Sequence, residues 1–213
     1  MMPRRTPAQP RSQGKRERKP VVYIVCEGSE TEIRYFRHFR SRNSLVEVRP
    51  FVSQHKSALG LVKHAQDVIK QEPFYPQDGD QLWCVFDRDN NSNQDLQKAE
   101  SFANRHNYRI AFSNPCFELW FLLHFIDQKG YLDDADAVIR LLNSHKAIPD
   151  YKKSGDYYDL IYPMMKIASE RANNLISLHT ADEKRLISRE SNPCTTAVRL
   201  LEYLSERRKA NNT

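Results

Sequence analysis

Residues 81–91, with the sequence QLWCVFDRDNN, constrain the fold more than any other part of the chain. Five of the first six residues are apolar, and they follow one another without a break. A strand with one face in water alternates polar and apolar residues, so this run predicts a strand that is buried on both faces. Such strands belong to parallel sheets with helices on both sides. The sequence therefore predicts an α/β fold.

Two acids follow this strand directly. Asp87 and Asp89 are two positions apart, and side chains at such positions of an extended segment project to the same side. The carboxyl edge of an open parallel sheet is where these folds bind their ligands. Two neighbouring carboxylates repel each other, and the oxygen ligands that they supply are those that Mg²⁺ and Mn²⁺ prefer. We therefore predict a divalent metal site at Asp87 and Asp89, the alternative being an ordinary polar turn.

The rest of the first 130 residues repeats the same strand and helix pattern. Continuous or alternating apolar runs predict four strands, at residues 21–26, 46–53, 81–86 and 108–112. Amphipathic segments predict helices at residues 29–42, opened by a capping-box pattern from Ser29 to Glu32, and at residues 57–69 and 93–107. This regular alternation predicts a parallel four-stranded sheet flanked by helices, with right-handed crossovers.

Two more acids are expected at the same edge of the sheet. Glu27 directly follows the first predicted strand. Asn114 and Pro115 fit the N-cap and the first position of a helix that starts after the fourth strand and is apolar on most sides. Glu118 lies near the start of this helix, and a carboxylate in apolar surroundings needs a partner. Glu118 is thus either a metal ligand, an acid that organises the site, or a residue that reaches solvent.

Polar and basic side chains near this edge are candidate substrate contacts. His55 and Lys56 follow the second strand, while Lys152 and Lys153 lie in a loop that also carries two tyrosines. Basic and aromatic residues interleaved in a loop can hold a nucleic-acid strand through phosphate contacts and stacking. Both segments also fit plain polar loops. The candidate substrate-binding residues are His55, Lys56, Asn114, Lys152 and Lys153.

The basic charge of the chain is concentrated at its start. Residues 1–20 hold seven Lys or Arg and four prolines, with little to bury, so we expect a disordered basic tail. Such a tail adds sequence-independent affinity for nucleic acid, or it is a solvated leader without a specific partner. Residues 21–130 are expected to form the α/β core. Residues 131–213 are helical by pattern and are expected to form a C-terminal extension packed on that core.

Apolar runs and cysteines bear on the location of the protein. The longest apolar runs fall far short of a membrane span, and the N-terminal residues lack the apolar core of a secretory signal. The four cysteines have no Cys-x-x-Cys spacing, which disfavours a zinc site or a disulfide framework. We therefore expect a cytoplasmic protein with reduced thiols and no membrane partner.

The motifs resemble two families, one within the other. The acid after the first strand and the Asp-x-Asp after the third resemble the Toprim domain of topoisomerases, primases and nucleases of the overcoming-lysogenization-defect type. More narrowly, residues 24–28, 85–89 and 114–120 (NPCFELW), with Asn192 and Pro193 later in the chain, resemble the RloB family. That family is encoded near restriction–modification systems and is assigned to antiphage or abortive-infection defence.

The resemblance implies a fold, a site and an activity. The fold is a Toprim-like, Rossmannoid sheet in which Asp87 and Asp89 hold Mg²⁺ or Mn²⁺. Glu27 is a further ligand or the general acid–base group, and Glu118 joins the site through the RloB-like motif. The expected activity is metal-dependent hydrolysis of phosphodiester bonds in RNA, tRNA or DNA. The alternative is a non-catalytic partner of a defence complex that binds nucleic acid or a nucleotide.

The same resemblance bears on partners. The chain holds no P-loop, so an ATPase or a restriction-system protein would have to be a separately encoded partner. Nucleic acid is the expected ligand, and a homo-oligomer is one candidate assembly.

Overall fold

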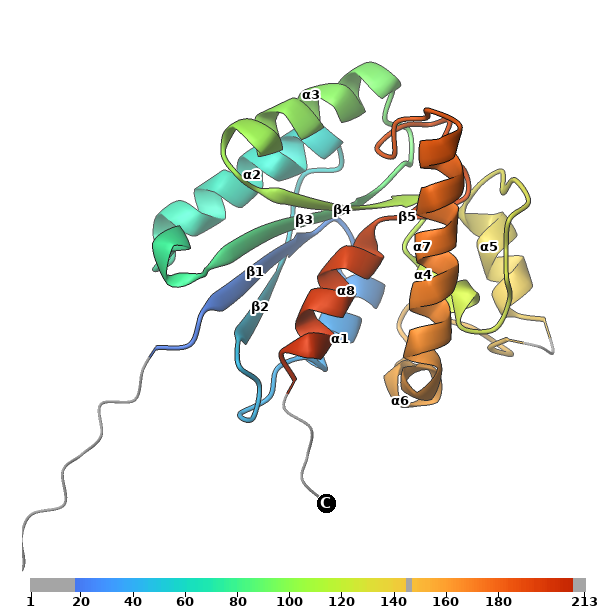
Figure 1. The fold of residues 1–213 in the computed structure, drawn as a ribbon, viewed down its shortest axis with the longest axis horizontal. Coiled ribbons are helices and arrows are strands. Elements are labelled where there is room, and N and C mark those ends of the chain that lie inside the picture. Colours follow the sequence, from blue (N-terminus) through green and yellow to red (C-terminus); the bar gives the residue numbers. More distant parts are fainter. Residues whose placement is uncertain (1–17, 145–146, 209–213) are drawn as a thin grey trace, which may run out of the picture.

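The computed structural model describes residues 18–144 and 147–208, and within them a five-stranded sheet forms the centre (Figure 1). The strands are β1 (Val21–Cys26), β2 (Glu47–Val52), β3 (Gln81–Asp87), β4 (Arg109–Asn114) and β5 (Cys194–Thr195). Their order is β2-β1-β3-β4-β5, with β5 antiparallel to β4 and the others parallel. The predicted α/β fold is confirmed. The predicted count of four strands is wrong, because two-residue β5 is too short to carry a strand pattern.

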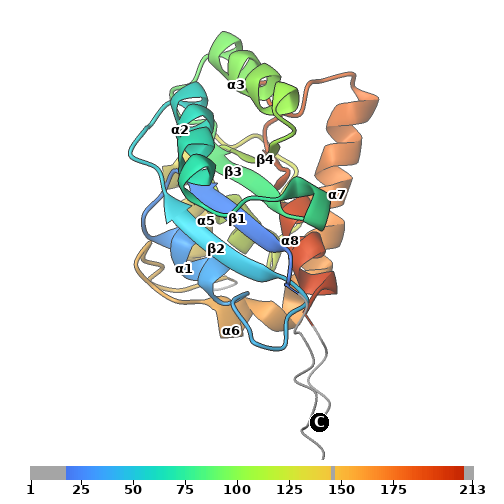
Figure 2. The ribbon, with the colours of Figure 1, turned by 90° about the vertical axis from the view of Figure 1, so that its left-hand side faces the viewer.

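Helices cover both faces of this sheet (Figures 1 and 2). On one face lie α2 (Ala58–Gln71) and α3 (Asn93–Arg105). On the other face lie α1 (Thr31–Arg37), α4 (Glu118–Leu123) and α8 (Ala197–Glu206). Alternate residues of β1 enter two separate cores, Tyr23 the one under α2 and α3 and Ile24 the one under the other helices. A strand buried on both faces is what the continuous apolar runs predict.

The C-terminal part is more than a helical extension. Its helices are α5 (Ala135–Leu142), α6 (Tyr158–Ile161) and α7 (Met165–Ala181), with α8 at the end. Short 3₁₀ turns occur at Pro76–Asp78 and Tyr162–Met164. However, β5 completes the sheet and α8 packs against β4, so this part of the chain also belongs to the α/β core.

Asn114, expected to cap a helix, has another place in the fold, where it contacts Asn192. Asn114 ends β4, and α4 begins only at Glu118, so the predicted N-cap is wrong. The peptide bonds from Asn114 and Asn192 to the following prolines are both cis. The two buried side chains meet, since Asn192 Nδ2 donates to Asn114 Oδ1 over 3.1 Å. Asn-Pro pairs occur in turns as well as at helix starts, so the sequence alone does not decide between them.

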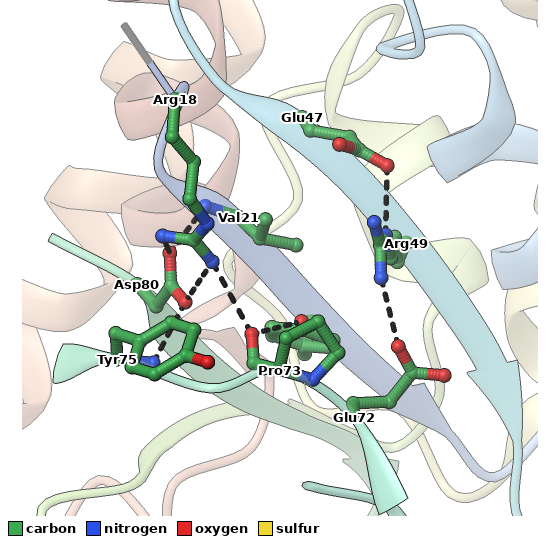
Figure 3. A network of polar contacts seen from close by, with 9 residues as sticks. Arg18, Val21, Glu47, Arg49, Glu72, Pro73, Tyr75 and Asp80 are labelled. Atoms are coloured by element: carbon green, nitrogen blue, oxygen red, sulfur yellow. Dashed lines mark hydrogen bonds and ion pairs between the residues drawn. The ribbon is translucent and has the colours of Figure 1, made fainter. Parts of the chain in front are cut away.

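Arg18 and Asp80 fix the start of β1 at the amino edge of the sheet. The guanidinium of Arg18 donates to both oxygens of Asp80, over 3.0 and 2.6 Å. The same carboxylate accepts the backbone N–H of Val21 over 2.7 Å and that of Tyr75 over 2.9 Å (Figure 3). Residues 18–20 are therefore part of the fold, and the predicted disordered tail of residues 1–20 is too long. Its residues 1–17 lie outside the described part.

The Asp80 contacts give a stability prediction. Burial alone would raise the pKa of Asp80, but the hydrogen bonds from Arg18, Tyr75 and Val21 outweigh it and lower that pKa. Asp80→Asn is expected to lower the free energy of unfolding by about 1.5 kcal/mol at pH 7, because an amide replaces one acceptor and half-exposed Arg18 contributes only in part. The lowered pKa stabilises the fold above the unfolded value and is lost in acid. Urea titrations should thus show the difference shrinking below about pH 4.

Exposed Asp78 on the same loop supplies the matched control, since its side chain makes no hydrogen bond or ion pair with the described residues. Asp78→Asn should leave stability within about 0.5 kcal/mol. Equal effects of the two substitutions would contradict a special role for Asp80.

Candidate functional site

A pocket of about 240 Å³ opens at the carboxyl ends of β1 and β3. Carboxylates dominate its lining, and two lysines also face it. The acids are Glu27, Glu30, Glu32, Asp87, Asp89 and Glu118, and the lysines are Lys56 and Lys153. The acids come from the ends of two adjacent strands and from the starts of α1 and α4. The predicted meeting of Glu27, Asp87, Asp89 and Glu118 at one edge of the sheet is confirmed.

Glu27 and Asp87 lie at the ends of two adjacent strands, and each has one buried carboxylate oxygen. The backbone N–H of Asp87 donates to Glu27 Oε2 over 3.3 Å. Two carboxylate oxygens, Glu27 Oε1 and Asp87 Oδ1, are buried and have no hydrogen-bond partner within the described part of the chain. Leaving a carboxylate oxygen in this state destabilises its charged form. The donors and positive charge near these two side chains therefore compensate only part of the cost of burying them.

The pKa values of this pair follow from these surroundings. Burial raises the pKa of Glu27 to about 7, although the hydrogen bond from the Asp87 N–H acts against it. Burial also raises the pKa of Asp87 well above its ordinary value, and the nearby charges of Glu32, Glu118 and Glu27 add to the effect. Both acids thus hold protons at a pH where free carboxylic acids have lost them.

Glu118 is held by hydroxyl groups on one of its oxygens. Thr31 Oγ1 donates to Glu118 Oε1 over 3.2 Å, and the hydroxyl of Tyr151 donates to the same atom over 3.1 Å. Lys153 Nζ lies 3.8 Å from it. With 2% of its surface exposed, Glu118 does not reach solvent, so that alternative is excluded. The sequence predicts that this carboxylate needs a partner, and the structure supplies two, Thr31 from α1 and Tyr151 from the loop after α5.

Glu32 is a pocket residue that the sequence reasoning missed. The sequence predicts a capping box from Ser29 to Glu32, but Glu30 occupies the N-cap position of α1, where it makes no side-chain capping bond. Glu32 turns inward instead and accepts the N–H of Gly28 over 3.2 Å. A Cβ on Gly28 would lie 2.1 Å from Glu32 Oε2, so a larger residue there would displace the Glu32 carboxylate. The sequence signal for Glu32 as a pocket residue is its position five residues after Glu27, at the start of the helix that follows the first strand. The capping-box pattern offers a second explanation for the same residue, so the signal is ambiguous.

Asp89 lies on a turn that neighbouring segments hold in place. Its φ of +35° is left-handed, so the expectation of an extended Asp87-to-Asp89 segment fails at Asp89, although both side chains line the pocket. Arg189 Nη1 donates to the carbonyls of Asp89 and Asn91 over 3.3 and 3.1 Å. The side chain of Asn91 accepts the N–H of Ala58 over 2.9 Å and so links this turn to the start of α2.

The sequence matches one family of proteins over most of its length. A family model described as RloB-like protein matches residues 22–204, which include every residue that lines the pocket. The chain belongs to the RloB-like protein family. The resemblance to the RloB family expected from the motifs is therefore confirmed. No curated protein and no solved structure matches this RloB-like chain.

The candidate substrate contacts of this RloB-like protein divide into two groups. Lys56 and Lys153 line the pocket. His55, Lys152 and Asn114 do not line it. The ring of His55 lies 5.6 Å from that of His64, and the Lys152 N–H donates to the Tyr157 hydroxyl over 2.8 Å. Asn114 is fully buried and donates to the carbonyls of residues 188 and 189.

The donor set of the pocket matches a hard divalent cation in chemistry. Oxygen ligands predominate, and two buried carboxylate oxygens, Glu27 Oε1 and Asp87 Oδ1, have no partner among the described residues. In residues 18–144 and 147–208, however, no three His, Cys, Asp or Glu side chains stand close enough together to hold a metal ion.

A membrane span is also absent from the described part of the chain. Residues 18–144 and 147–208 contain no helix long and apolar enough to cross a membrane.

Proposed function

We propose that this RloB-like protein is a divalent-metal-dependent nuclease that hydrolyses phosphodiester bonds, with RNA, including tRNA, as its first candidate substrate. The observation that carries the proposal is the Glu27 and Asp87 pair, which lines one pocket at the carboxyl edge of a parallel sheet and has two buried oxygens without partners among the described residues. Burying unpaired charge costs stability, so such a pair is typical of a binding or catalytic site. The proposal includes a Toprim-like arrangement, supported by the acids after neighbouring strands β1 and β3.

The residues divide into cation holders and groups that act on the substrate. Glu27 and Asp87, with Asp89 beside them, would hold Mg²⁺ or Mn²⁺. When bound, the ion supplies Lewis-acid stabilisation of a phosphoryl oxygen. Lys56 and Lys153 face the pocket with positive charge and would orient the phosphate and neutralise charge that develops on it. Glu118, held by Thr31 and Tyr151, keeps Lys153 near that position.

The setting of the activity belongs to the same proposal. We assign the nuclease to antiphage defence in the cytoplasm because of its RloB-like motifs and their association with restriction–modification systems. Since the chain carries no P-loop, any step driven by ATP would depend on a separately encoded ATPase or restriction-system protein.

Incubation of the purified protein with tRNA, single-stranded RNA and plasmid DNA tests the activity. We expect cleavage with Mg²⁺ or Mn²⁺ and none with a chelator. Asp89→Asn should slow cleavage at least about tenfold, because it removes one charge from the pocket. The fold should persist, since asparagine tolerates the left-handed φ at this position. Cleavage that survives the chelator, or that is equally fast in Asp89→Asn, would argue for a contaminating enzyme.

One observation favours a second candidate, a module that binds nucleic acid or a nucleotide without cutting it. Within the described ranges no three potential ligands converge on one point. A binding module would retain its ligand with and without metal and would leave every substrate intact. Measurement of binding beside cleavage, on the same RNA, separates the two candidates.

A further inference from the structure

Helices α2 and α3 enclose a groove of about 470 Å³ on the outer surface of the protein. Cationic and neutral polar side chains dominate its lining, and none of the described residues that line it is acidic. The polar lining residues are Lys63, Gln94, Gln97, Lys98, Ser101 and Arg105. This groove therefore differs in charge from the acidic pocket at the sheet edge.

The three cations of the groove are available to a ligand. Lys63, Lys98 and Arg105 are exposed and form no hydrogen bond or ion pair with other described residues. Two of the three acids on these helices pair with cations outside the groove, Asp67 with Lys70 and Glu100 with Arg185. The third, Asp95, binds the hydroxyl of Ser92, and the nearby charge of Lys98 also helps to lower the pKa of Asp95. Among the described residues, the groove lining itself carries three positive charges and no negative one.

The lining residues of α3 form one continuous stripe. They recur every three or four positions between Gln94 and Arg105, which places them along one side of the helix. At 1.5 Å per residue, this stripe is about 16 Å long. A surface of this shape suits an extended chain with regularly spaced negative charges better than it suits a single small anion.

The groove begins at the edge of the sheet where the acidic pocket lies. Lys56 lines the pocket, and α2 starts two residues later at Ala58. The side chain of Asn91, on the turn after β3, binds the N–H of Ala58, and α3 starts at Asn93. Both helices then run side by side over one face of the sheet (Figure 1). A chain lying in the groove is thereby directed toward Lys56.

We infer that the groove between α2 and α3 binds the phosphodiester backbone of the nucleic acid whose scissile bond enters the acidic pocket. The inference rests on the proposed nuclease function and adds the path of the substrate. Lysine, arginine, serine and glutamine are the side chains that contact phosphates in protein–nucleic acid complexes. These contacts follow the backbone and carry no base sequence, so the groove supplies affinity and orientation.

The test compares two triple variants of the full chain. The groove variant carries Lys63→Gln, Lys98→Gln and Arg105→Gln. The control variant carries Arg140→Gln, Lys166→Gln and Arg199→Gln, three exposed cations on α5, α7 and α8. Both variants lose three positive charges, so they share any effect of net charge. Affinity for a fluorescent single-stranded RNA of about 20 nucleotides is measured by anisotropy at several KCl concentrations, with chelator to prevent metal-dependent cleavage.

The groove variant should bind more weakly, and the slope of log K against log [KCl] should become shallower by about 2, since each phosphate contact contributes about 0.7. The control variant should keep the wild-type slope within about 0.5. Equal slopes in the two variants, or an acidic peptide that competes as well as RNA at equal charge, would overturn the inference. Cleavage is scored separately, so a binding protein that never cuts fails the nuclease proposal and leaves the groove intact.

Discussion

Glu27→Gln is expected to stabilise the protein by about 2 kcal/mol above pH 7 and to destabilise it by about 1 kcal/mol at pH 4. The pKa of Glu27 rises from an ordinary value of 4.5 to about 7 in the fold. Between these values the folded state binds the proton more tightly than the unfolded chain, so wild-type stability falls as pH rises and then levels off. Above pH 7, removing the charge of Glu27 should raise the free energy of unfolding by about 3 kcal/mol. The buried amide without a partner lowers it by about 1 kcal/mol, which leaves a net gain of about 2 kcal/mol.

Chemical denaturation at several pH values between 4 and 8 measures the stability difference between Glu27→Gln and wild type and the pH at which it changes sign. Glu30→Gln is the matched control, because Glu30 lies three residues away, is exposed and, within residues 18–144 and 147–208, forms an ion pair with Arg34 alone. Its stability should stay within about 0.5 kcal/mol of wild type at every pH. A Glu27→Gln protein that is less stable than wild type at pH 8 would show that the carboxylate is compensated in the fold.

The sequence predicts the centre of this fold well because that centre is governed by local patterns. Continuous apolar runs mark β1 and β3, and alternate residues of β1 do enter two cores. By contrast, β5 exists only because Cys194 and Thr195 pair with the end of β4, about 80 positions earlier in the chain. A two-residue strand has no periodicity of its own, so its pairing depends on tertiary contacts.

The acids of the candidate site are predictable because local patterns mark the strands that precede them, whereas the contacts that hold the site together are not. Glu27 and Asp87 stand directly after recognisable strands, and parallel strands bring their carboxyl ends to one edge. The supporting contacts come from remote segments. Tyr151 reaches Glu118 from the loop after α5, and Arg189 reaches the turn at Asp89 from a loop about 100 positions away. No short motif encodes such contacts, so these residues could not be found from the sequence.

Asn114 shows how a correct motif can receive the wrong physical interpretation. The Asn-Pro pair belongs to the stretch that identified the family, yet its asparagine neither caps α4 nor lines the pocket. It joins β4 to the loop before β5 through Ser188 and Asn192. Its position therefore bears on the pocket only through the backbone that leads from β4 to Glu118.

The largest expected effect on activity is that of Asp87→Asn, which should slow metal-dependent cleavage about 10³-fold. Lewis-acid stabilisation by a bound divalent ion contributes several kcal/mol, and about 4 kcal/mol corresponds to this factor. Stability should change in the opposite direction. Burial and the surrounding acids raise the pKa of Asp87, so folding at neutral pH requires this side chain either to take up a proton or to bury its charge, and a neutral amide requires neither. Single-turnover cleavage and urea denaturation of the same preparation measure both effects.

Opposite changes in activity and stability are what distinguish a site acid from a structural one. Asp80 at the other edge of the sheet is also buried, but its four hydrogen bonds lower its pKa, so Asp80→Asn should lose stability and keep the pocket intact. Asp87 has one buried oxygen without a partner among the described residues, and a bound cation would stabilise its charged form. An Asp87→Asn protein that cleaves within tenfold of wild type, or that loses activity because it unfolds, would remove the physical basis for placing a cation at this edge.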